Sequence, residues 1–94
     1  MSFFRARLDH ATPLQARYLR AMAELGPDPQ RAQDVANLMD RSSTQLGPVR
    51  AQLIDLGLLY TPGHGLAAFT VPQFDQYLKR IMPKLEMPER HFGR

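Results

Sequence analysis

Apolar residues that recur every three or four positions predict a first helix over residues 13–25. Thr12, Pro13 and Gln15 suit its start, because the threonine hydroxyl and the glutamine side chain can form a capping box around a first-turn proline. Gly26, which precedes another proline, ends the pattern. The stripe expected to face the core consists of Leu14, Tyr18, Met22 and Leu25, broadened by Leu19 and Ala21.

A second, shorter helix is predicted from Arg31 to Met39. Asp40 follows at a turn position that is often left-handed, a conformation that aspartate tolerates. The residues expected to point inward are Val35, Ala36 and Met39.

A third helix is predicted before Gly57, which ends it. Three hydroxyl residues precede its apolar pattern and can cap it: Ser42, Ser43 and Thr44. Its buried stripe is expected to consist of Leu46, Val49, Leu53 and Leu56.

The next segment indicates a β-hairpin followed by a helix. Residues 58–61 and 66–71 are rich in strand-forming residues, and Pro62-Gly63-His64-Gly65 suits a compact tip between them. Pro72 opens the following helix and Pro83 closes it. The apolar side of this helix is expected to carry Phe74, Tyr77, Leu78 and Ile81.

The order of elements predicts a mainly α fold with a β-hairpin. Two strands are not stable alone, so the hairpin is expected to lean on the helices. This arrangement is typical of a winged helix-turn-helix, with a three-helix bundle, a two-stranded wing and a C-terminal helix. We expect residues 1–11 to be a linker or N-terminal extension, 12–82 the winged-helix domain and 83–94 a loose tail.

Several stretches resemble the C-terminal winged-helix domain of bacterial and archaeal AAA+ ATPases related to origin-recognition initiators. They are "ATPLQARYLRAMAELG", "DVANLM" and "LGPVRAQLIDLGLLYTPGHGLAAFTVPQFDQYLKR", which together cover about residues 10–82. The resemblance implies a module that contacts DNA or regulates an ATP-binding parent protein. The chain has no GxxxxGK[ST] motif, so the ATPase activity of such a parent would lie elsewhere. Two readings stay open, an excised piece of a longer ATPase or a free-standing relative such as a transcriptional regulator.

Composition excludes several other classes. The chain has no cysteine and no apolar run long enough for a membrane span, so we expect a cytoplasmic protein. The three histidines, His10, His64 and His91, lack metal-ligand spacing, and the carboxylates are scattered. We therefore expect no metal, no cofactor, no small-molecule substrate and no catalysis by this chain.

The net charge of +3 allows a nucleic-acid partner but does not supply a broad basic surface. Between Asp9 and Leu78 five arginines face seven carboxylates, so the middle of the chain carries −2. The outward side of the third helix is plain, with Gly47, Pro48 and Ala51 along it and no arginine or asparagine to read bases. Small residues there would let a phosphodiester backbone approach closely.

The DNA contacts expected are therefore peripheral and largely independent of base sequence. The amino end of the third helix can cradle a phosphate, because free amides and the helix dipole favour an anion. Arg50 flanks this helix, and His64 at the wing tip is a weaker candidate. The predicted site consists of Arg41, Ser42, Ser43, Thr44, Gln45, Arg50 and His64.

A protein-interaction module is the alternative function. Apolar residues near both ends of the chain could form a homodimer interface or dock on an AAA+ ATPase module. These residues are Phe3, Phe4, Leu8, Leu85, Met87 and Phe92.

Overall fold

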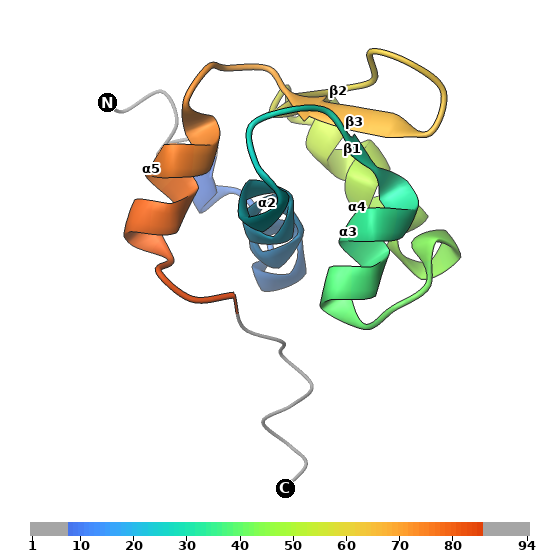
Figure 1. Cartoon of the computed structure of the whole chain (residues 1–94), viewed down its shortest axis with the longest axis horizontal. Coiled ribbons are helices and arrows are strands. Elements are labelled where there is room, and N and C mark those ends of the chain that lie inside the picture. Colours follow the sequence, from blue (N-terminus) through green and yellow to red (C-terminus); the bar gives the residue numbers. More distant parts are fainter. Residues whose placement is uncertain (1–7, 86–94) are drawn as a thin grey trace, which may run out of the picture.

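The computed structural model describes residues 8–85, which form a mostly helical fold with a small antiparallel sheet (Figure 1). The first half contains α2 (Pro13–Leu25), β1 (Gln30–Arg31) and α3 (Ala32–Met39). The second half contains α4 (Ser43–Asp55), β2 (Leu59–Tyr60), β3 (Leu66–Phe69) and α5 (Phe74–Ile81). Within residues 13–81 the chain therefore runs through three helices, a hairpin and a last helix, with one short strand added before α3.

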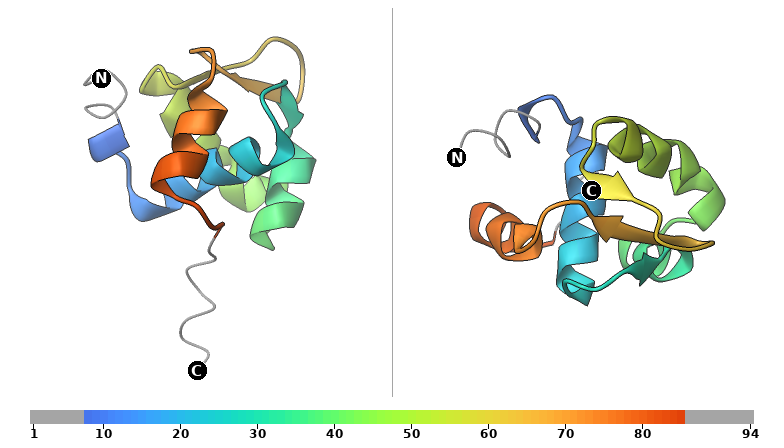
Figure 2. Two further views of the ribbon diagram at one scale, coloured as in Figure 1. Left: turned by 60° about the vertical axis from the view of Figure 1, so that its left-hand side comes forward. Right: turned by 90° about the horizontal axis from the view of Figure 1, so that it is seen from above.

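Helix α2 lies at the centre and packs against α3, α4 and α5 (Figure 2). It begins with the predicted capping box between Thr12 and Gln15, and it ends at Gly26, whose φ is +123°. Contact with neighbours on several sides explains why α2 buries more than one stripe, including Tyr18, Leu19 and Met22. The prediction for Leu25 was wrong: it lies in the last turn and is 38 % exposed.

Helices α3 and α4 are joined by a tight turn at Asp40, which adopts the predicted left-handed conformation with φ 58°. The inward residues of α3 are confirmed as Val35, Ala36 and Met39. In α4 the first three predicted core residues, Leu46, Val49 and Leu53, are buried, whereas Leu56 is only partly buried. Leu56 is the C-terminal cap of α4 and precedes the turn at Gly57, which explains its partial exposure.

The sheet has three strands in the order β1–β3–β2, all antiparallel. The hairpin strands β2 and β3 are shorter than predicted, because pairing extends only over Leu59–Tyr60 and Ala68–Phe69. The third strand was missed: Gln30 pairs with Ala67 and Arg31 with Leu66, so the predicted start of α3 at Arg31 is one residue early. This pairing attaches the hairpin to the segment between α2 and α3.

Helix α5 is held against α2 by apolar and polar contacts. Phe74 and Leu78 are buried, but the predicted inward residue Ile81 is 40 % exposed in the last turn. The buried Arg20 of α2 donates hydrogen bonds to the carbonyls of Met82 and Pro83, just after α5 ends. The cation therefore meets carbonyls at the negative end of the helix dipole.

The compact body extends slightly beyond residues 12–82. Leu8 and Leu85, which were expected to lie outside it, pack against the core as partly buried residues. The other terminal apolar residues lie outside the described part of the chain: Phe3, Phe4, Met87 and Phe92. Among the described residues, no helix combines the length and apolar character that crossing a membrane requires.

Candidate nucleic-acid interface

The first turn of α4 is exposed except at Ser43, which is partly buried, and it is closed by a capping box. The Ser42 hydroxyl accepts a hydrogen bond from the Gln45 amide at 3.0 Å, and the Gln45 side-chain oxygen accepts one from the Ser42 amide at 2.9 Å. Each of these side chains thus accepts a hydrogen bond from the backbone amide of the other residue. The amides of Ser43 and Thr44 belong to the first turn, where no intrahelical carbonyl is in reach. They are the donors that an anion at this end would meet.

The outward side of α4 consists of small or uncharged residues, as predicted, with Asp55 as its late carboxylate. The exposed positions are Thr44, Gln45, Gly47, Pro48, Ala51, Gln52 and Asp55. At Gly47 an added Cβ atom would meet no other atom within 4 Å, so this part of the helix is open to a partner's backbone. Gln52 is not free to contact a base, because its side-chain oxygen accepts a hydrogen bond from the side-chain amide of Gln15 in α2.

Arg50 is engaged with the hairpin. Its Nη2 donates to the Leu66 carbonyl at 2.9 Å, and the side chain is half-buried. The guanidinium also acts on Tyr18: burial raises the pKa of that phenol above its ordinary value, and the positive charge of Arg50 partly opposes the rise in pKa. Arg50 therefore fixes β3 against α4, and a DNA contact by Arg50 stays a prediction.

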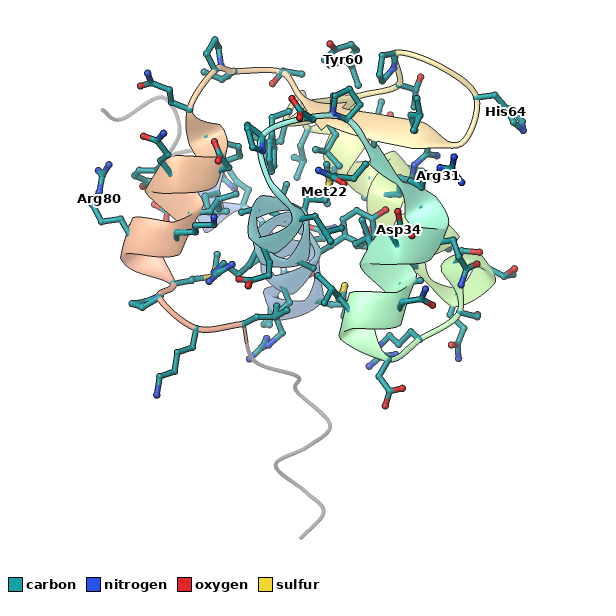
Figure 3. All side chains as sticks on the ribbon, in the orientation of Figure 1. Met22, Arg31, Asp34, Tyr60, His64 and Arg80 are labelled. Atoms are coloured by element: carbon teal, nitrogen blue, oxygen red, sulfur yellow. The ribbon has the colours of Figure 1, made fainter. Side chains whose placement is uncertain are left out.

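The hairpin tip brings His64 close to Arg31, a residue that sequence reasoning left out of the site. Both side chains line a hollow of about 460 Å³ together with Gln33 and Gly65, and both are exposed. Figure 3 shows His64 at the outer tip of the hairpin with Arg31 at the same end of the molecule. Pairing of β1 with β3 places Arg31 there. A two-residue strand leaves no periodic signal, so only its basic character could have suggested it.

Arg41 lies at the turn that leads into α4. It lines a shallow hollow of about 280 Å³ with Asn37, Asp40, Ser42 and Gln45. Arg41 is half-buried, with its Nε shielded from solvent, and its backbone amide donates to the Ala36 carbonyl at 3.0 Å. The structure thus brings Arg41 and the cap residues together at one end of α4.

The predicted residues therefore form two groups, and Arg50 belongs with His64, because both line one hollow at the hairpin end. One group surrounds the start of α4 (Arg41, Ser42, Ser43, Thr44 and Gln45), and the other is His64 with the added Arg31. Asp34, in the first turn of α3, is exposed near Arg31 and weakens the positive field there (Figure 3). This arrangement suits a few positioned phosphate contacts better than a continuous basic groove.

No metal-binding cluster is seen in the described part of the chain. Within residues 8–85, no three histidine, aspartate or glutamate side chains gather in a way that could hold a metal ion.

Comparison with known proteins identifies a family but not an activity. Residues 1–78 match the model of a family described as "Domain of unknown function (DUF8462)". No curated protein and no solved structure matches the chain.

Proposed function

The chain belongs to the DUF8462 family, and for this member we propose a DNA-binding winged helix-turn-helix that holds duplex mainly through phosphates. In this assignment α3 and α4 form the helix-turn-helix, and β2 and β3 form the wing. The order of the elements and the antiparallel hairpin directly after α4 support it. The strand β1 adds a third member to the wing sheet.

The observation that carries the proposal is the exposed first turn of α4. Its Ser43 and Thr44 amides and the helix dipole favour a phosphate, and Arg41 lies directly before the cap. The small outward residues that follow allow the duplex backbone to approach the helix. Arg31 at the wing supplies a second phosphate contact at a distance from the first.

The same features predict weak selectivity for base sequence. Direct readout needs side chains such as arginine or asparagine presented to base edges. The outward side of α4 offers none, because Arg50 donates to the hairpin and Gln52 accepts from α2. Phosphate contacts position a protein without specifying bases, so we assign base selection to another part of the assembly.

We extend the proposal to a parent AAA+ ATPase that this module would serve as a tethered DNA contact. This part rests on the resemblance of the residue stretches around α2, α4 and the hairpin. A longer reading frame that carries a P-loop would support it.

Binding of the chain to random-sequence duplex tests the proposal. We expect affinity to fall steeply between about 50 and about 200 mM salt, with Arg31→Gln and Arg41→Gln each reducing the salt slope by about one unit. Arg80→Gln is the matched control, since it removes the same charge from α5 at the other side of the molecule (Figure 3). Equal losses for all three variants, or no binding at low salt, would contradict the assignment.

A protein-interaction module is the second candidate, favoured by a hollow between α2 and the end of α5. It has a volume of about 450 Å³ and is lined mainly by apolar side chains, among them Pro13, Ala16 and Ile81. Sedimentation of the same sample separates the two functions. A tight dimer that ignores duplex supports interaction, and a monomer that binds duplex supports the DNA module.

A further inference from the structure

A buried carboxylate lies in a second hollow, away from the proposed DNA contacts. Asp75 of α5 is only 6 % exposed. Within residues 8–85 its carboxylate has no hydrogen-bond donor and no ion-pair partner. Its oxygens are not among the side-chain polar atoms of the described residues that are fully shielded from solvent, so the carboxylate keeps a small accessible surface. It lies in the first turn of α5, where the helix dipole favours a negative charge. The carboxylate is therefore charged, reachable from solvent and without a cation from residues 8–85.

The surroundings of Asp75 suit a cation. The hollow has a volume of about 400 Å³, and Tyr60 and Phe69 of the sheet line it beside Pro27, Pro72 and Gln73. Tyr60 lines the hollow and is 48 % exposed, so it is available to a ligand. No lysine or arginine of the described chain lines the hollow. Aromatic rings attract cations through their faces, and the carboxylate adds a full negative charge.

The backbone around this hollow is constrained. Gln73 adopts a left-handed conformation with φ 66°, and it caps α5 without a side-chain hydrogen bond. Such conformations are unfavourable for residues other than glycine and are often found where a ligand is held. Phe69 is fixed by an edge-to-face contact with Phe74, with ring centroids 5.5 Å apart. One aromatic wall of the hollow, beside Tyr60, is therefore held in place.

From these contacts we infer that the hollow binds the guanidinium of an arginine side chain from a partner protein. A planar guanidinium can donate two parallel hydrogen bonds to Asp75 while it stacks on Tyr60. Neither Asp75 nor Tyr60 belongs to the proposed DNA contacts, so this inference does not depend on DNA binding. The partner would dock at the end of the molecule where β3 leads into α5 (Figure 1).

Backbone amide shifts during titration with N-acetyl-arginine amide test this inference on the full chain. We expect saturable shifts at Tyr60 and over residues 69–75, and none with N-acetyl-citrulline amide, which has the same shape without the charge. Asp75→Asn should weaken binding about tenfold and Tyr60→Leu about threefold. Asp55→Asn, an exposed carboxylate on α4, is the control that should leave binding unchanged.

Three outcomes would overturn the assignment. The first is equal binding of the citrulline and arginine probes, and the second is unchanged affinity in both Asp75→Asn and Tyr60→Leu. The third concerns Arg5 and Arg7, which lie outside the described residues. If the probe binds only after both are changed to glutamine, the chain's own arginine occupies the hollow. The Tyr60→Leu variant keeps the test valid if Asp75→Asn fails to fold.

Discussion

Two helices, α2 and α4, begin with the same motif but in different surroundings. Thr12 with Gln15 and Ser42 with Gln45 form matching capping boxes, each with two reciprocal hydrogen bonds of 2.9–3.1 Å. At α2 the glutamine is 7 % exposed and donates a further hydrogen bond to Gln52 of α4. At α4 the glutamine is exposed, and no hydrogen bond links its amide nitrogen to another part of residues 8–85.

The N-terminal end of α2 is used for packing within the fold, whereas the N-terminal end of α4 is open to solvent. The buried box connects α2 to α4, so its polar atoms are fully engaged within the fold. The exposed box satisfies only its own helix and leaves the first-turn amides of α4 facing solvent. Identical local chemistry thus supports packing in one place and leaves an exposed helix start in the other.

The largest effect on stability is expected at the buried glutamine. Gln15→Ala removes its half of the capping box and the bond to Gln52, and it leaves a cavity at a buried position. We expect a loss of about 2–3 kcal/mol in the free energy of unfolding, measured by urea denaturation. Gln45→Ala should lose about 1 kcal/mol or less. Equal losses would show that the buried box has no additional structural role.

The cap hydroxyls provide a matched pair for function. Thr12→Ala and Ser42→Ala should each lower the free energy of unfolding by about 1 kcal/mol, because each removes one acceptor at a helix start. Only Ser42→Ala should also weaken duplex binding, since the variant loses the cap of the first turn of α4, which is the proposed phosphate site. Fluorescence anisotropy with labelled duplex measures this. Equal affinities for the two variants would remove the functional distinction between the boxes.

Local features of the fold could be predicted well from sequence. Both capping boxes depend on residues three positions apart, and the left-handed turn at Asp40 depends on a single residue. Helical spacing identified the buried residues in the middle of the helices. It failed at Leu25 and Ile81 because these lie in last turns, where the number of neighbouring elements decides burial rather than periodicity.

Features that depend on distant pairing could not be predicted. The strand β1 has two residues and exists because β3 lies beside it, more than thirty positions along the chain. Arg31 entered the candidate site through that pairing. Arg50 was correctly placed on the flank of α4, but no spacing rule could show that the Leu66 carbonyl accepts from it. The hollow beside Asp75 likewise could not be predicted, because three separate segments of the chain line it.

Gly47 offers a test in which stability and binding should change in opposite directions. It lies in helix α4, and an added Cβ atom would meet nothing within 4 Å. Gly47→Ala should therefore raise the free energy of unfolding by about 0.5–1 kcal/mol, since alanine favours helix more than glycine does. If a phosphodiester backbone lies against this face, the same change weakens duplex binding. A more stable variant with unchanged affinity would place the duplex elsewhere.

The smallest effect at neutral pH is expected at Tyr18, beneath α4. Burial raises its pKa above 10.0 in the folded chain, so between that value and the raised pKa the unfolded chain loses the phenolic proton and the folded chain keeps it. Stability should therefore be unaffected below about pH 10 and fall as pH rises through this window. Urea midpoints measured on both sides of pH 10 should drop less for Tyr18→Phe than for the unmodified chain. Tyr60→Phe, half-exposed on β2, is the control that should follow the unmodified chain.

The charge of Arg50 opposes the rise in the Tyr18 pKa. The Arg50→Met variant should therefore begin to lose stability at the same pH as the unmodified chain, but its loss should continue to a higher pH. An unchanged alkaline profile in Arg50→Met would mean that the guanidinium acts on the hairpin alone.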